Sequence, residues 1–199
     1  KILTFSGNVN YSNERNTNPP QVNTQDMAVP TTVATLSTSM PFEALEQNQV
    51  HPDGSEFVMS RFLVRNNPYY SINYRKENIL RDRVIGNLTF RLQLTDWLYF
   101  QGRIAQDWYT RYQDYNIPNY YAPRPAAPTG FVSGSYTQDV RNFKERNFDF
   151  LIGSTHKIND FGVDISAGGN TMYRKDEYHS VNVNDFIQPG LYTIMNGRE

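Results

Sequence analysis

The chain has 199 residues, of which 38% are hydrophobic, and a formal net charge of −1 from 19 basic and 20 acidic side chains. No segment approaches the roughly 18 consecutive apolar residues that a spanning helix needs, and no basic run is present that could follow a line of phosphates, so nucleic-acid binding is excluded as a main function. Cysteine is absent, which excludes disulfides and thiolate metal sites.

Five segments alternate apolar and polar residues with period 2, which predicts five β-strands. The apolar positions, in chain order, are Leu3, Phe5, Gly7, Val9 and Tyr11; Val84, Gly86, Leu88, Phe90, Leu92 and Leu94; Leu98, Phe100, Gly102 and Ile104; Phe148, Phe150 and Ile152; and Val163, Ile165, Ala167 and Tyr173. A soluble sandwich shows the same local alternation. Segments of about ten residues match tilted strands that cross a membrane.

The connections between these segments alternate between short and long. Thr95 to Trp97 and Asn159-Asp160 are short, whereas the chain from 13 to 80, from about 113 to 144, and after Lys175 is long. Short turns at one end and long loops at the other are typical of outer-membrane barrels, and compact soluble domains rarely carry structureless loops of this length. We therefore expect an all-β fold, part of a large antiparallel transmembrane β-barrel with long extracellular loops. One short helix is expected near Pro41.

Aromatic residues make up 14% of the chain, and several lie where a barrel carries its interfacial girdles. From Trp97 to Trp108 a strand tilted by 40° rises about 28 Å, close to the expected apolar band of about 25 Å. Trp108, Tyr109 and Tyr112 are therefore predicted to form part of the outer girdle.

The turn lengths and the alternation also predict how each hairpin is paired. Leu94 should lie opposite Leu98, which places Phe90 opposite Gly102, and the second hairpin should place Phe150 opposite Gly169. Each hairpin then sets an aromatic ring against a glycine, so that the ring covers exposed backbone.

Three stretches, taken together and in order, carry a family resemblance. The first is Asn67-Pro68-Tyr69-Tyr70, followed by Arg81-Asp82-Arg83-Val84-Ile85-Gly86-Asn87-Leu88; the second runs from Thr95-Asp96-Trp97-Leu98 through Gln101-Gly102-Arg103 to Asp107-Trp108-Tyr109; the third is Ala167-Gly168-Gly169-Asn170, followed by Pro189-Gly190-Leu191-Tyr192-Thr193. With this combination the chain resembles the SusC/RagA family of TonB-dependent transporters in the Bacteroidetes outer membrane.

The resemblance implies a barrel of about 22 strands with an N-terminal plug, a SusD-like surface lipoprotein as partner, and energy delivered by the TonB complex. It implies active import of an oligosaccharide or a peptide across the bacterial outer membrane, in contact with lipid. The chain begins directly in a strand pattern at Lys1. We therefore expect residues 1–199 to be a partial barrel domain that lacks the plug and N-terminal domains.

The residues give no sign of catalysis, of a cofactor or of a metal, so no enzyme is expected. His51, His156 and His179 are far apart and lack the spacing of metal ligands. Ser154 and His156 share a strand face, but that face is expected to point toward lipid.

The candidate ligand-contacting residues are aromatic side chains of the long connections, namely Tyr69, Tyr120 and Tyr121, because tyrosine rings stack on sugars and fit peptide side chains. Charged residues on the opposite strand face are expected to line a solvated barrel interior and to form cross-strand pairs or to contact the plug. They are Arg91, Arg103, Asp107, Asp149, Asp164 and Arg174.

Two other functions stay open on the sequence. The chain could be a soluble or surface-exposed β-rich module for glycan binding or adhesion, which would purify without detergent. It could also belong to a barrel enzyme, which a hydrolase assay on the intact protein would reveal.

Overall fold

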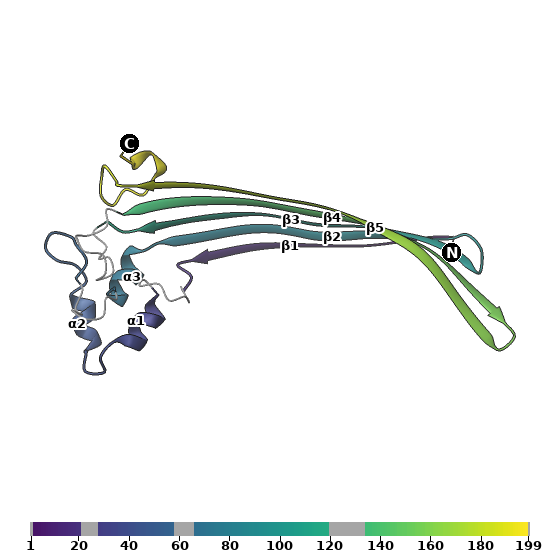
Figure 1. Cartoon of the computed structure of the whole chain (residues 1–199), viewed down its shortest axis with the longest axis horizontal. Helices are drawn as coiled ribbons and strands as arrows, with labels where there is room; N and C mark the ends of the chain where they lie inside the picture. Colours follow the sequence, from purple (N-terminus) through teal and green to yellow (C-terminus); the bar gives the residue numbers. More distant parts are fainter. Residues whose placement is uncertain (1, 21–27, 58–65, 120–133, 199) are drawn as a thin grey trace. The chain divides into compact units, whose positions relative to one another are not determined.

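The computed structural model describes residues 2–20, 28–57, 66–119 and 134–198. Five strands form one antiparallel sheet in the order β1-β2-β3-β4-β5, so each strand pairs with its neighbour in the sequence (Figure 1). The strands are β1 (Leu3–Thr17), β2 (Glu77–Gln93), β3 (Leu98–Ile117), β4 (Ser135–Ile158) and β5 (Phe161–Asn184). The predicted all-β class and the five strands are confirmed. The sheet is open, with β1 and β5 at its edges.

The two predicted turns are also present. Between β2 and β3, the backbone N–H of Leu94 donates to the carbonyl of Leu98 at 2.9 Å, which is the predicted pairing. Between β4 and β5, Asn159 has a φ of 55°, in the left-handed region. Asparagine adopts this conformation more readily than most residues, which suits a two-residue hairpin turn.

All five strands extend beyond the alternating segments at the ends away from the two short turns, so the predicted strand ends on that side were wrong. The third strand continues to Ile117, the fourth begins at Ser135 and the fifth continues to Asn184. These added ends mix polar, charged and aromatic residues on both faces, so a strict alternation of apolar and polar residues does not reveal them. Backbone pairing holds them instead, as where the N–H of Asn116 donates to the carbonyl of Lys76 at 3.0 Å.

The chain divides into two compact units, and the strands contribute to both. The strand unit consists of Lys1–Glu14, Arg81–Arg111 and Val140–Tyr178; the loop unit consists of Arg15–Leu80, Tyr112–Asp139 and His179–Glu199. Among the described residues of the strand unit, Phe143 is the one large hydrophobic side chain that is buried. The strand unit therefore lacks the apolar core that usually stabilises a domain in water.

The loop unit contains the helices α1 (Val29–Thr35), α2 (Phe42–Gln47) and α3 (Pro68–Tyr74), and a 3-10 turn at Ile194–Asn196. Helix α3 contacts both α1 and α2 (Figure 1). The helix expected near Pro41 is α2, whereas α1 and α3 were not predicted. No helix in the described ranges is long and apolar enough to cross a membrane.

Asn67 organises the small core of the loop unit and is itself buried. Its side-chain oxygen caps α3 by accepting from the N–H of Tyr69 at 3.0 Å, and Pro68 follows as the first helical residue. Its amide nitrogen donates to the carbonyls of Leu45 at 2.8 Å and Asn48 at 2.9 Å. The Asn-Pro motif therefore joins α3 to the end of α2.

Candidate functional site

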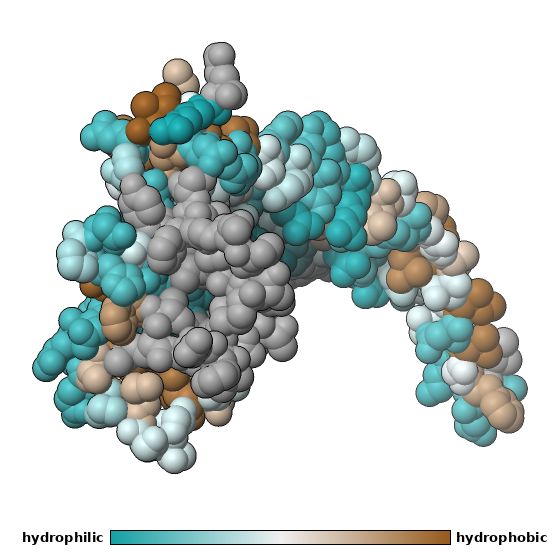
Figure 2. Space-filling model, turned by 60° about the vertical axis from the view of Figure 1, so that its left-hand side comes forward, coloured by the Kyte–Doolittle hydropathy of each residue, from teal (hydrophilic) through white to brown (hydrophobic). Residues whose placement is uncertain are grey.

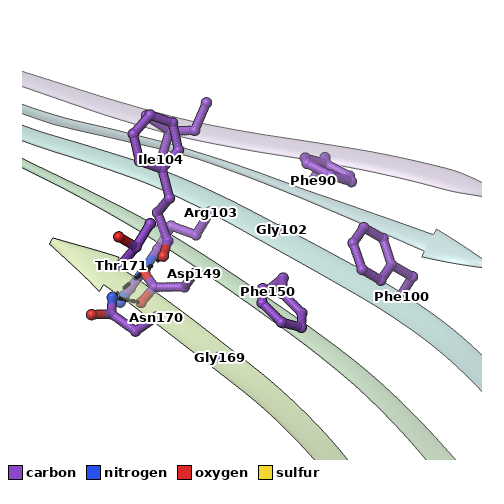
Figure 3. Close-up of a pocket in the computed structure, with 11 residues that line it drawn as sticks. Phe90, Phe100, Gly102, Arg103, Ile104, Asp149, Phe150, Gly169, Asn170 and Thr171 are labelled. Carbon is purple, nitrogen blue, oxygen red and sulfur yellow. Dashed lines mark hydrogen bonds and ion pairs between the residues drawn. The ribbon is translucent and has the colours of Figure 1, made fainter.

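The apolar face of the strand unit carries the two predicted ring-on-glycine pairs. A Cβ atom added to Gly102 would overlap the ring of Phe90, and one added to Gly169 would lie 2.8 Å from the ring of Phe150. Both hairpin registers are therefore confirmed. Phe90 and Phe100 are also in ring contact, with centroids 5.7 Å apart, and Figure 3 shows these aromatic rings beside the two glycines.

The phenylalanines and glycines border a shallow hollow of about 340 Å³ on this face (Figure 3). Its walls come from β2, β3, β4 and β5, with Ile104, Phe148 and Thr171 beside the rings. Most of the lining surface is apolar, and the polar residues at its border are Arg103, Asp149, Asn170 and Thr171, so the hollow offers few groups to orient a polar ligand.

Large hydrophobic side chains remain exposed along the whole of this face. Phe150 is 55% exposed, Ile165 64% and Val9 78%, and Figure 2 shows hydrophobic residues at the surface of the strands (brown, lower right). The others that share the face are Leu3, Phe5, Tyr11, Leu88, Leu94, Ile104, Trp108, Phe148, Ile152, Phe161, Val163 and Tyr173. Full burial of one such side chain is worth about 1.5–3 kcal/mol. If this face were left in water, the free energy that burial of these side chains could contribute would be lost. Summed over the set, it is as large as the free energy of unfolding of an entire domain.

We call these positions the apolar band, and no charged residue interrupts it between the turns and the level of Tyr173. On β2 it runs from Val84 to Leu94, and on β5 it runs from Val163 to Tyr173. Either span corresponds to about 25 Å along the axis of a barrel with strands tilted by about 40°. If the strands were tilted as in a barrel wall, the band would be as high as the hydrocarbon core that such a wall crosses.

The opposite face of the strand unit carries a row of ion pairs between neighbouring strands. Arg83 binds Asp107 through two hydrogen bonds of 2.9 and 2.6 Å, and Arg141 binds Asp176 with the same geometry. Between them, Arg103 binds Asp149 at 2.6 Å, and Asn170 donates to the same carboxylate (Figure 3). These pairs are partly exposed, so each is worth no more than about 1 kcal/mol in water.

Aromatic residues on the charged face extend this pattern. The guanidinium of Arg91 lies 3.7 Å from the centroid of the Tyr99 ring, within cation–π range, and that ring covers Gly153. The sequence did not predict the Tyr99–Gly153 pair. It joins β3 to β4, whose register no short turn fixes.

Of the three residues predicted for an outer girdle, one lies on the opposite face from the other two. The ring of Tyr109 stacks on Phe143, with centroids 5.0 Å apart, on the charged face. Successive residues of a strand point to opposite faces, so Trp108 and Tyr112 share the apolar face and Tyr109 does not. Phe143 also lies 5.0 Å below the guanidinium of Arg174.

No family model matches this chain. No curated protein matches it either.

Of the three predicted ligand-contacting tyrosines, one lies in the described part of the chain. Tyr69 is half-buried on α3, while Tyr120 and Tyr121 lie outside the described residues. Tyr70, which follows Tyr69, has more contacts with the loop unit than Tyr69 has. It is buried, its ring stacks on Tyr74 with centroids 4.6 Å apart, and its hydroxyl donates to the carbonyl of Asn119 at 3.1 Å. Tyr70 therefore serves packing.

The histidines show no catalytic or metal-binding arrangement in the described part of the chain. His156 packs its ring against Trp97, with centroids 4.8 Å apart, and His51 packs against Phe57 at 4.7 Å. In the ranges that the structure describes, no group of three or more acidic or histidine side chains could hold a metal ion. The candidate functional feature is therefore the sheet of the strand unit, with the apolar band on one face and the ion pairs on the other.

Proposed function

We propose that the chain forms part of the wall of an outer-membrane β-barrel through which a nutrient is imported. The observation that carries the proposal is the uncharged apolar band on one face of the sheet, directly behind a row of ion pairs on the other. In a barrel wall, the apolar face contacts lipid and the charged face lines the interior. Neither face by itself would require a barrel wall. An apolar band about 25 Å high, combined with ion pairs on the opposite face, supports one.

The open sheet completes its hydrogen bonding in this proposal by pairing with further strands at β1 and β5. An unpaired strand edge is costly in hydrocarbon, where no water replaces the missing partner. Five strands are also too few to close a barrel around a channel. The chain therefore acts as one segment of a larger wall.

The import of an oligosaccharide or a peptide rests on the sequence resemblance to SusC/RagA transporters. The long connections would contribute to ligand binding on the extracellular side, together with a SusD-like lipoprotein. The TonB complex would supply energy through parts of the protein outside this sequence. The chemistry is binding and gating, and no bond of the cargo is broken.

Membrane insertion is tested first. The full-length protein should fractionate with the outer membrane, resist extraction by alkaline carbonate, and require detergent for purification. Recovery of the folded protein from the soluble fraction without detergent would contradict the proposal and favour the glycan-binding or adhesion module.

Import is tested separately, in cells. Deletion of the gene should abolish uptake of a labelled oligosaccharide or of a labelled peptide, and loss of TonB in a strain with the intact gene should have the same effect. Because passive diffusion does not need TonB, uptake that survives its loss would rule out active import while leaving the membrane-wall assignment intact.

A further inference from the structure

The apolar band ends at a cluster of three basic residues, which we call the basic cluster: Lys144, Arg146 and Lys175. Lys144 and Arg146 precede Phe148 on β4 by even numbers of residues, and Lys175 follows Tyr173 on β5 by two, so all three share the face of the apolar band. A hydrogen-bonded neighbour confirms this for Arg146. Its guanidinium donates to the side-chain oxygen of Gln106 at 3.2 and 3.3 Å.

The register places two of these cations directly opposite one another. Because Phe150 lies opposite Gly169, Lys144 lies opposite Lys175, six residues further along each strand. Like charges that face each other across a ladder destabilise a sheet. Lys175 reaches Glu177 at 2.7 Å, whereas among the described residues Lys144 has no ion-pair partner. The cluster therefore keeps a surplus of positive charge that an anion would neutralise.

Aromatic side chains of interfacial type flank the basic cluster. Tyr109 stacks on Phe143 across β3 and β4, which places Trp108 opposite Lys144. Trp108 is 48% exposed and Tyr173 is 57% exposed. Tryptophan and tyrosine favour the boundary between hydrocarbon and water, where one end of the side chain is apolar and the other is wet.

The other end of the band has no counterpart to this cluster. Toward the turns, the described positions of the same face carry His156 and no lysine or arginine. Among the described residues of this face, the positive charge therefore lies at the boundary on the side of the long connections.

We propose that the basic cluster binds the phosphates of a lipid headgroup in the leaflet at that boundary. This inference rests on the proposed membrane location, because it needs the apolar band to lie in hydrocarbon. The position of the cluster at the edge of the band favours a lipid over free phosphate, since the acyl chains would lie along the band below. Lysine and arginine near a membrane surface each strengthen binding of anionic lipid about fivefold, equivalent to about 1 kcal/mol.

The test uses the full-length protein in a neutral detergent. The protein is titrated with a diphosphorylated lipid and with its dephosphorylated counterpart, and bound lipids are counted by native mass spectrometry. The variants are Lys144→Gln and the triple variant Lys144→Gln, Arg146→Gln and Lys175→Gln. The matched control is Lys157→Gln, which removes one exposed cation from the same strand, on the opposite face and near the turn.

We expect the wild type to retain the phosphorylated lipid in preference to its counterpart. Lys144→Gln should weaken retention about fivefold, the triple variant should remove the preference, and Lys157→Gln should leave it unchanged. A wild type without preference, or a triple variant that still has it, would overturn the inference. Since the wild-type comparison needs no substitution, a misfolded variant cannot leave the question open.

A separate measurement distinguishes failure of this inference from failure of the proposed function. The wild type is reconstituted into vesicles of phosphatidylcholine alone, and its β-structure and protection from protease are measured. Insertion without a preference for phosphorylated lipid would refute the headgroup site and keep the barrel wall. Failure to insert would refute both.

Discussion

Replacement of Phe150 by arginine should separate a membrane wall from a water-soluble sheet. Phe150 lies opposite Gly169, close to the middle of the band that runs from Val163 to Tyr173 on β5. Arginine on the lipid face near the midplane costs about 2–4 kcal/mol. Loss of the half-buried ring adds roughly 1 kcal/mol, so we expect a destabilisation of about 3–5 kcal/mol for Phe150→Arg in a bilayer.

The matched control is Leu151→Arg, one residue along the same strand at nearly the same depth. Leu151 points to the charged face, where an arginine would lie near Asp149. Its effect should stay within about 1 kcal/mol. In water the two variants should differ little, because Phe150 is already 55% exposed.

The measurement is the urea midpoint of the full-length protein in phosphatidylcholine vesicles, followed by circular dichroism. Equal effects of Phe150→Arg and Leu151→Arg, or a larger effect of Leu151→Arg, would mean that the lipid face is wrongly assigned. A second pair, Phe90→Arg and Gln93→Arg, tests the other hairpin in the same way. Phe90 covers Gly102 on the apolar face, so Phe90→Arg should be the damaging change.

Three further outcomes test other parts of the chain. Asn67→Ala removes a helix cap and the bonds to the carbonyls of Leu45, which is buried, and Asn48, so it should cost about 2–4 kcal/mol and speed amide exchange in α3. Hydrogen bonds from the hydroxyl and the N–H of Ser55 lower the pKa of Asp53. The contribution of this turn to stability is therefore fully present above the ordinary carboxyl pKa and is lost as the pH falls through the lowered pKa. Ser55→Ala should raise the pKa of Asp53 in an NMR titration. In intact cells, a cysteine at Asn119 should be labelled from outside and one at Asp160 should not; the reverse would invert the topology.

The hairpin registers could be predicted from the sequence because a short turn leaves few alternatives. Once alternation assigns Phe90 and Gly102 to one face, the turn from Thr95 to Trp97 fixes which residues are opposed. The same reasoning fixed Phe150 opposite Gly169. Both pairings can be predicted from the alternation of each hairpin and the length of its turn alone.

The buried contacts of the loop unit could not be predicted in this way. Asn67 followed by Pro68 is a recognisable helix start, and that signal was available in the sequence. Its other partners, the carbonyls of Leu45 and Asn48, lie far back along the chain and follow no period. The strand ends away from the turns were missed for a related reason, because segments that mix polar and aromatic residues on both faces have no strict alternation to detect.

In the pairing of β3 with β4, the apolar face and the charged face contribute to the register in different ways. The connection between these strands is long, so side chains must select the alignment. A slip of one residue between the two strands would turn either Arg103 or Asp149 toward the apolar face, which a membrane would penalise strongly and water would not. A slip of two residues keeps every side chain on its own face, but it separates Arg103 from Asp149 and moves the Tyr99 ring off Gly153. In the proposed barrel wall, the membrane would therefore select the face of each strand, and the contacts on the charged face would select among the alignments that remain.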